Sequence, residues 1–177
     1  DGRALRHGDT LPTSENMPST WRKGRKLPRE KIPTHGHSHT LRVVLGPQED
    51  AFGQAGLSTF LSSTYTVTAQ SDRTGYRLHG PEIQHREGAD IISDGSPLGA
   101  VQVAGDGMPI VLLADRGTTG GYTKIATVIS VDIACLAQAI PGDIVSFRAV
   151  TVEEAHGELR QQEHMLQELL DTPLTTL

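Results

Sequence analysis

The sequence predicts a mainly β protein whose strands form a closed antiparallel β-barrel, accompanied by short helices and a C-terminal helix. Three observations support this class. The chain of 177 residues contains 19 glycines and 10 prolines, which suits many short strands joined by tight turns. Seven or eight strand-like runs follow one another with only short helical segments between them. Closure into a barrel removes the unpaired edges that so many short strands would otherwise expose.

The chain divides into three parts. Residues 1–40 are interpreted as a connector that starts with the end of a preceding β element, because four prolines interrupt a polar stretch without periodicity. Residues 41–150 hold the strand-like runs, and residues 151–177 a C-terminal helix and tail. Residues 1–42 carry nine Lys/Arg against four Asp/Glu, whereas residues 43–177 carry seven against seventeen. We therefore expect the connector to be solvated or to dock on an acidic partner.

The strand-like runs share apolar residues that alternate or continue between turn residues. They lie at residues 41–45, 64–69, 76–78, 90–93, 99–103, 109–114, 125–131 and 144–150. The run at 109–114 is continuously apolar, so we expect it to be buried on both faces.

Helices are expected at four places. Residues 48–52 and 57–61 form two short helical turns separated by glycines. Asp132 is predicted to cap a helix at 133–139, because a carboxylate accepts hydrogen bonds from unpaired backbone N–H groups. A capping box with Thr at the N-cap and Glu three residues later opens a helix that runs from Thr151 to about Leu170 with an apolar stripe.

Three alternating histidines, His35, His37 and His39, stand just before the first strand of the barrel. On an extended chain their imidazoles point to one side, and imidazole is a common metal ligand. Zinc sites usually add ligands at a recognisable spacing, and none stands out in the sequence. We therefore predict a solvated loop here and no metal site.

Several function classes are disfavoured by composition. The single cysteine, Cys135, excludes an internal disulfide framework and fits a reducing compartment. The sequence shows no signal-peptide pattern, and no apolar run approaches the ~20 residues of a membrane helix. The basic cluster Arg22–Lys26 lacks interleaved aromatic residues. We predict a cytoplasmic protein that binds neither membranes nor nucleic acids.

The stretch most informative about function is residues 91–128, which combines glycines, apolar strands and isolated charges. A buried strand leads Asp115 and Arg116 into a Thr/Gly loop, and Lys124 lies on the strand that leaves this loop. We expect Asp115 and Lys124 to face each other across the turn at the rim of the barrel. Small-molecule sites tend to occur where a few polar groups converge beside an apolar core.

Four segments of the chain resemble one protein family. They are GPQEDAF, FLSSTYTVTAQSDRTGYRLHGP, DIISDGSPLGAVQVAGDGMPIVLLADRGTTGGYTKIATVISVD and LAQAIPGDIVSF. The chain is thereby identified as similar to the 5-oxoprolinase C-subunit family, also labelled allophanate hydrolase subunit 2 or biotin-dependent carboxyltransferase, and to part of the carboxyltransferase region of urea carboxylase. The resemblance covers roughly residues 41–155. It implies a cyclophilin-like β-barrel.

The resemblance implies a hydrolase subunit that is active only within a complex. The complex would hydrolyse 5-oxo-L-proline to L-glutamate with ATP, alongside a sister subunit and a lactam-hydrolase subunit. One alternative is a carboxyltransferase or allophanate hydrolase module of urea degradation, acting on a small amide. Another is a regulatory module that acts on a histidine kinase through its sister subunit. ATP is a possible cofactor without an assigned site, and biotin would arrive on a partner chain, because the sequence lacks a biotin-accepting Met-Lys pair.

The sequence departs from the family pattern in two ways. Family members are nearly twice as long, so this chain is interpreted as the C-terminal half plus the connector. Gly117 occupies a position of the Asp-Arg-x-Thr-Thr-Gly-Gly loop where the family usually carries a side chain.

Amide-opening chemistry of this kind would assign roles to the polar residues around the Thr/Gly loop. Opening an amide requires a polarised carbonyl, so Lys124, Arg73 and Arg116 are candidates to stabilise negative charge. Asp115 is a candidate base, or it orients one of these cations. The hydroxyls of Thr118 and Thr119 and the backbone N–H groups of Gly120 and Gly121 are candidates for an anion-binding nest. Tyr76 and Tyr122 are candidates for an apolar wall. Gln102 is a candidate to hydrogen-bond an amide.

A purely structural interpretation of these residues stands beside the functional one. Asp115 and Arg116 can form a local ion pair, Arg73 can brace its own turn, and Thr-Thr-Gly-Gly can be turn chemistry. Residue by residue, structure is the more common role. Taken together at one barrel rim, they favour a site.

Overall fold

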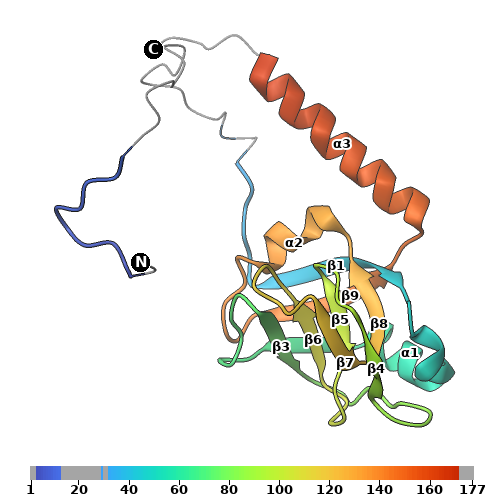
Figure 1. Cartoon of the computed structure of the whole chain (residues 1–177). Coiled ribbons are helices and arrows are strands. Elements are labelled where there is room, and N and C mark those ends of the chain that lie inside the picture. Colours follow the sequence, from blue (N-terminus) through green and yellow to red (C-terminus); the bar gives the residue numbers. More distant parts are fainter. Residues whose placement is uncertain (1–2, 13–28, 30–31, 172–177) are drawn as a thin grey trace. The chain divides into compact units, whose positions relative to one another are not determined.

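Seven strands between residues 38 and 149 close into a barrel (Figure 1). The computed structural model describes residues 3–12, 29 and 32–171. The chain separates into one unit of residues 1–33 and 172–177 and a second unit of residues 34–171. The basic cluster at 22–26 and the C-terminal tail lie outside the described residues.

A turn lies near the start of the described part of the first unit. The Asp9 carboxylate accepts hydrogen bonds from the Arg3 guanidinium at 2.8 Å and from the Arg6 backbone N–H at 2.7 Å. Gly8 has φ of +93°, a left-handed conformation that glycine adopts without steric cost. The Asp9 N–H donates to the Arg6 carbonyl at 3.1 Å and closes the turn.

The barrel strands are short, and they lie in an order different from their order in the sequence. Around the ring the order is β1 (Ser38–Leu45), β8 (Lys124–Val128), β5 (Ala100–Val103), β6 (Pro109–Leu112), β3 (Gly75–His79), β2 (Thr64–Val67) and β9 (Ile144–Ala149). The predicted mainly β fold with a closed barrel is confirmed. The run at 109–114 is largely buried, as its apolar composition predicts.

One pair of barrel strands corrects the expectation of a wholly antiparallel barrel. β1 and β9 run parallel, with Ser38 opposite Ile144 and Val43 opposite Ala149. The other six neighbouring pairs are antiparallel. Strand direction must alternate around a ring of antiparallel pairs, and seven strands cannot alternate completely. An odd number of strands therefore requires at least one parallel pair.

The core of the barrel consists mainly of aliphatic residues with a small aromatic group. Phe60 of α1 (Gly53–Ser62) stacks on Phe147 of β9 with ring centroids 4.4 Å apart, and Tyr65 of β2 packs beside Phe147. α1 follows a short 3-10 helix, η2 (Glu49–Ala51), so the two predicted helical turns are present. These aromatic contacts attach α1 to the barrel.

α2 (Ser130–Leu136) begins earlier than the sequence predicts, which changes the role of Asp132. Its N-cap residue is Ile129, and Asp132 lies buried in the first turn. The Asp132 carboxylate accepts hydrogen bonds from the Arg42 backbone N–H at 2.7 Å and from the Arg42 guanidinium at 2.6 Å. Asp132 therefore ties α2 to β1, and the prediction that it caps the helix is wrong.

α3 (Val152–Asp171) starts at the predicted capping box. The Thr151 hydroxyl accepts from the Glu154 N–H at 3.1 Å, and the Glu154 carboxylate accepts from the Thr151 N–H at 2.7 Å. An ion pair of 2.7 Å between Arg42 and Glu158 links α3 to β1. No helix in the described part of the chain is long and apolar enough to span a membrane.

A two-stranded ribbon outside the ring replaces part of the predicted Thr/Gly loop. It pairs β4 (Asp90–Gly95) with β7 (Thr119–Tyr122) in antiparallel fashion. Asp94 lies opposite Gly120, and the register shifts between Asp90 and Asp94. Glycine-rich β7 was not recognisable as a strand, because its residues lack most of the β-branched side chains that mark one.

Candidate active site

Lys124, the first residue of β8, is completely buried. Its ammonium nitrogen lies 3.1 Å from Oδ2 of Asp94 on the ribbon strand β4. The contact is an ion pair whose orientation leaves the ammonium without a hydrogen-bond acceptor among the described residues. Lys124 lowers the pKa of the Asp94 carboxyl, assisted by the Gly95 N–H and by Gln48. A buried cation with unused donors is unusual, because desolvation of an ammonium is costly.

Two further buried donors lie beside Gly120 of β7, and one of them is on the strand that pairs with Lys124. Gln102 of β5 is the cross-strand partner of Lys124, and its Nε2 has no hydrogen-bond partner within the described part of the chain. The hydroxyl of buried Ser96, which follows β4, is unpaired among the same residues. A Cβ on Gly120 would lie 2.6 Å from Gln102 Nε2 and 3.0 Å from Ser96 Oγ, so the glycine leaves space for both groups.

We call Lys124, Gln102 and Ser96 the donor cluster. Four buried side-chain nitrogen or oxygen atoms lack a hydrogen-bond partner in the portion of the chain that the structure describes, and three belong to this cluster. The fourth is the hydroxyl of Tyr65. Unpaired buried polar groups are rare in folded proteins and often mark a functional site.

Gln48 connects the donor cluster to a polar cavity of about 600 Å³. Its side-chain oxygen accepts a hydrogen bond from the Lys124 backbone N–H at 3.1 Å, and its amide nitrogen donates to Asp94 at 3.2 Å. The same glutamine lines the cavity together with Arg86, Asp90 and Thr123. Gln48 therefore links the cavity to the ion pair of Lys124 and Asp94, although neither of these two residues lines the cavity.

Arg73 and Asp115 form a separate and exposed pair. The Arg73 guanidinium donates to both Asp115 oxygens, at 2.7 and 2.9 Å, with side-chain exposures of 76% and 53%. Arg73 lowers the pKa of Asp115. The expectation that Asp115 faces Lys124 across the turn is wrong, because β7 diverges from the barrel to pair with β4 and Lys124 turns into the interior.

The remaining residues of the Thr/Gly loop contribute mainly to local structure. Arg116 donates to the Ser96 carbonyl at 2.8 Å and to the Leu113 carbonyl at 3.2 Å, so it pairs with backbone oxygens and not with Asp115. The Thr118 carbonyl accepts from the Ser96 N–H at 2.9 Å. These contacts hold the segment that carries Ser96.

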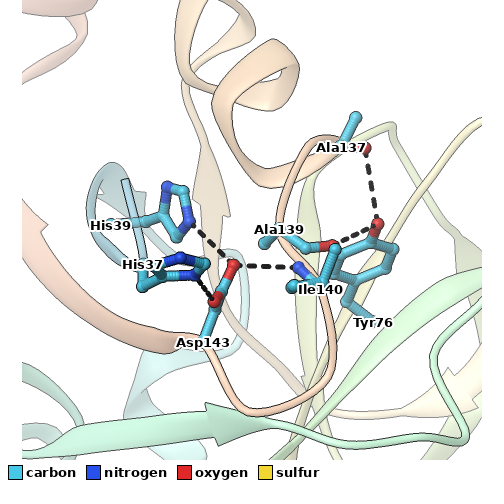
Figure 2. A network of polar contacts seen from close by, with 7 residues as sticks. All are labelled: His37, His39, Tyr76, Ala137, Ala139, Ile140 and Asp143. Carbon is cyan, nitrogen blue, oxygen red and sulfur yellow. Dashed lines mark hydrogen bonds and ion pairs between the residues drawn. The ribbon is translucent and has the colours of Figure 1, made fainter. Parts of the chain in front are cut away.

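The predicted nest and wall are arranged differently. Thr119, Gly120, Gly121 and Tyr122 form β7, with Tyr122 opposite Asp90 and 40% exposed. Tyr76 does not provide a wall for this site. Its hydroxyl donates to the carbonyls of Ala139 at 3.1 Å and Ala137 at 3.5 Å, in the loop after α2 (Figure 2).

Residues 32–38 are exposed, as expected for a solvated loop, but two of the three alternating histidines, His37 and His39, also contact a carboxylate. His37 Nδ1 lies 2.6 Å from Asp143 Oδ1, and His39 Nε2 lies 3.4 Å from Oδ2 (Figure 2). Asp143 also accepts a hydrogen bond from the Ile140 N–H at 2.9 Å. Asp143 and His39 are buried, whereas His37 is exposed. Within the described residues no group of three or more metal-binding side chains is arranged around an ion position.

The sequence indicated Lys124 and Gln102 as site residues, but it did not identify Gln48, Ser96 and Asp94. Asp94 and Ser96 lie at the polar end of a strand-like run, where they look like turn residues. Gln48 lies directly after Gly46-Pro47 in the first of the four segments that resemble the family. Its place in that segment was the one sequence feature that could have indicated Gln48 as a site residue.

The groups of the donor cluster are suited to bind oxygens that carry or develop negative charge. All three groups can donate hydrogen bonds, and burial strengthens such interactions because the surroundings cannot reorient to screen the charge. Asp94, with its half-exposed carboxylate, occupies the position of such an anion beside Lys124. A ligand carboxylate or carbonyl oxygen could replace it.

Comparison with known proteins agrees with the resemblance found in the sequence. Residues 1–149 match the model of the carboxyltransferase domain, subdomains A and B. The chain is 32% identical over 169 residues to the C-subunit of 5-oxoprolinase from Escherichia coli (strain K12), covering 96% of this chain and 53% of that protein. It thus spans about half the length of this curated relative.

The chain is also similar to a small part of two urea amidolyases. Urea amidolyase of Saccharomyces cerevisiae is 28% identical over 192 residues, covering 100% of this chain and 10% of that protein. The crystal structure of urea amidolyase from K. lactis superimposes with a TM-score of 0.75 over 85% of this chain and 10% of that chain, at 23% identity. At this identity, the structural likeness shows the fold alone.

Proposed function

The chain belongs to the carboxyltransferase domain family of subdomains A and B, and from this membership we propose that it is a subunit of an ATP-dependent complex that hydrolyses 5-oxo-L-proline to L-glutamate. The proposal is supported by its 32% identity to the 5-oxoprolinase C-subunit over 96% of this chain. The chain spans 53% of that relative, so we propose that activity requires a sister subunit and a lactam-hydrolase subunit.

The observation that carries the proposal is the buried donor cluster. Opening a lactam moves negative charge onto the carbonyl oxygen, and fixed donors stabilise this charge without having to reorient. In our proposal the lactam oxygen displaces the Asp94 carboxylate from Lys124. It then accepts hydrogen bonds from Lys124 and Gln102, while Ser96 positions the neighbouring part of the ring.

The two implied cofactors fit this cluster differently. A triphosphate carries several negative charges, whereas the cluster has one cation, Lys124, already paired with Asp94. ATP does not fit here, and we propose that it binds on another chain of the complex. A carboxylate carried by biotin has a single charge and does fit. When bound, it would supply a transferable carboxyl group, and Lys124 and Gln102 would hold its oxygens.

Carboxyl transfer to a small amide is therefore the second candidate function. The family description and the similarity to urea amidolyase favour it. Both candidates use the same donors to hold an oxygen, so the site alone does not choose between them. They differ in the partner chain that delivers the activated group: a lactam hydrolase or a biotin-carrying carboxylase.

Reconstitution of the complex tests the proposal. We expect glutamate release from 5-oxoproline and ATP only when the chain, its sister subunit and the lactam hydrolase are combined. Lys124→Met should lower turnover about 100–1,000-fold, the usual effect of losing one oxyanion donor. Arg148→Met, which removes an exposed cation from β9, is the matched control and should leave turnover unchanged.

Two results would refute the first function. One is glutamate release that does not need this chain, and the other is normal turnover in Lys124→Met. Transfer of carboxyl from carboxylated biotin to urea, lost in Lys124→Met, would instead establish the second function.

A further inference from the structure

Gln48 is held against Lys124 just after β1. Its backbone N–H donates to the Lys124 carbonyl at 3.1 Å, and its side-chain oxygen accepts from the Lys124 N–H at 3.1 Å. Gly46 turns the chain towards this contact, because its φ of +98° is a left-handed conformation that glycine adopts without steric cost. Both the backbone and the side chain of Gln48 are therefore fixed by one residue of β8.

The Gln48 amide and the Lys124 ammonium meet at one oxygen, Oδ2 of Asp94. Lys124 Nζ lies 3.1 Å from this atom, and Gln48 Nε2 donates to it at 3.2 Å. The amide cannot be reversed, because its nitrogen would then face the Lys124 N–H and its oxygen would face the Asp94 carboxylate. The position of Asp94 Oδ2 is thus a place for one oxygen atom, with a buried cation and an oriented N–H donor beside it.

Gln48 also lines the polar cavity of about 600 Å³. Three carboxylates belong to the lining of this cavity, those of Asp50, Glu87 and Asp90, together with one cation, Arg86. An ionised carboxylate accepts hydrogen bonds and cannot donate them. A ligand in the cavity is therefore favoured when it presents N–H groups to the lining and an oxygen to Gln48.

We propose that Gln48 is a specificity-determining residue that binds the amide oxygen of the substrate together with Lys124. This inference rests on the proposed function, in which the substrate oxygen displaces the Asp94 carboxylate. Gln48 Nε2 then donates to the substrate oxygen, while the N–H of the same amide faces the acidic lining of the cavity. The ligand class is a small amide with a free N–H, which includes both lactams and urea.

The test measures the binding of two neutral probes to the full chain by titration calorimetry, without ATP or partner subunits. The probes are 2-pyrrolidinone, a lactam with a free N–H, and N-methyl-2-pyrrolidinone, which lacks this group. Gln48→Glu keeps an oxygen acceptor for the Lys124 N–H but removes the N–H donor, so it isolates the contact with the ligand. Gln54→Glu makes the same change at an exposed position of α1 and is the matched control.

We expect saturable binding of 2-pyrrolidinone to the wild type and to Gln54→Glu. Its affinity should fall about tenfold or more in Gln48→Glu, because a hydrogen bond to the ligand is lost. The N-methyl probe should bind the wild type about tenfold or more weakly than 2-pyrrolidinone, because its nitrogen has no hydrogen for the acidic lining. This comparison uses no variant, so it tests the proposal even where a substitution disturbs the fold.

Three results would overturn the proposal: equal affinity of the two probes for the wild type, unchanged affinity of 2-pyrrolidinone in Gln48→Glu, or no binding of 2-pyrrolidinone to the wild type. Hydrolysis is not measured in this experiment. A reconstituted complex that releases no glutamate would therefore refute the proposed function and leave the binding result unaffected.

Discussion

Lys124 Nζ lies 3.1 Å from Asp94 Oδ2, but 1% of the Lys124 side chain is exposed against 53% of the Asp94 side chain. Asp94→Asn would leave the buried ammonium without its counter-charge. Because the ammonium is buried, leaving it without this counter-charge is destabilising, so we expect the thermal midpoint to fall by about 5 °C or more. Thermal unfolding measures this directly.

A double-mutant cycle separates this ion pair from other effects of the substitution. Asp94→Asn/Lys124→Met removes both charges, and it should be more stable than Asp94→Asn alone. If the two single changes simply add, Asp94 does not neutralise Lys124, and the ion pair is not a working part of the site.

Substitution of two adjacent glycines, Gly120 and Gly121, tests whether the donor cluster needs the space that Gly120 leaves free. In Gly120→Ala the new methyl group would meet Gln102 Nε2 at 2.6 Å and Ser96 Oγ at 3.0 Å, so both side chains must move. We expect turnover of the reconstituted complex to fall about tenfold or more, with a cost of roughly 1–3 kcal/mol in the free energy of unfolding. Gly121→Ala is the control, because its methyl group would lie 3.6 Å from the Ile91 carbonyl, an ordinary contact. Equal activity of the two variants would contradict the proposed site.

The exposed pair of Arg73 and Asp115 leads to a different expectation. Exposed ion pairs contribute little to stability, so Arg73→Ala should change the thermal midpoint by less than about 2 °C. Because Arg73 binds Asp115 and not the donor cluster, turnover should fall less than in Lys124→Met. A loss of turnover as large as that of Lys124→Met would instead make Arg73 part of the reacting site, as the sequence pattern indicates.

Asp143 gives the fold a defined dependence on pH. The Ile140 N–H and then His37 lower the pKa of its carboxyl below the ordinary value, with a smaller contribution from His39. Asp143 therefore stabilises the fold at pH above the ordinary carboxyl pKa, and this contribution is lost as the pH falls through the lowered pKa. Asp143→Asn should be less stable than the wild type near neutral pH, and the difference should shrink as the pH falls below the ordinary carboxyl pKa of about 4. Denaturant unfolding across this range measures it, with Glu87→Gln, an exposed carboxylate, as control. A difference independent of pH would refute the charge effect.

Local patterns predicted much of the fold. Thr151 and Glu154 indicated the start of α3, because a capping box is recognised from four consecutive residues. The apolar run at 109–114 predicted β6 and its burial. The parallel pairing of β1 with β9 was not predictable in this way, since it depends on how many strands join the ring.

The candidate site was predictable only in part. Lys124 and Gln102 were recognised as polar residues on strands of an apolar barrel. Their partner Asp94 was missed, because the ribbon that brings it to Lys124 includes glycine-rich β7, which has little strand propensity. The burial of Lys124 was missed because a lysine after a polar loop normally remains at the surface.

The parallel pairing of β1 with β9 affects when the barrel can close during translation and how the chain responds to truncation. β1 and β9 meet through residues 106 positions apart, such as Thr40 and Ser146. A nascent chain leaving the ribosome therefore cannot complete the ring until almost all of the barrel has been translated. Because β9 lies between β1 and β2, a premature stop before β9 exposes two strand edges at once. Such edges pair readily with other chains, so the truncated product should aggregate and not persist as an open sheet.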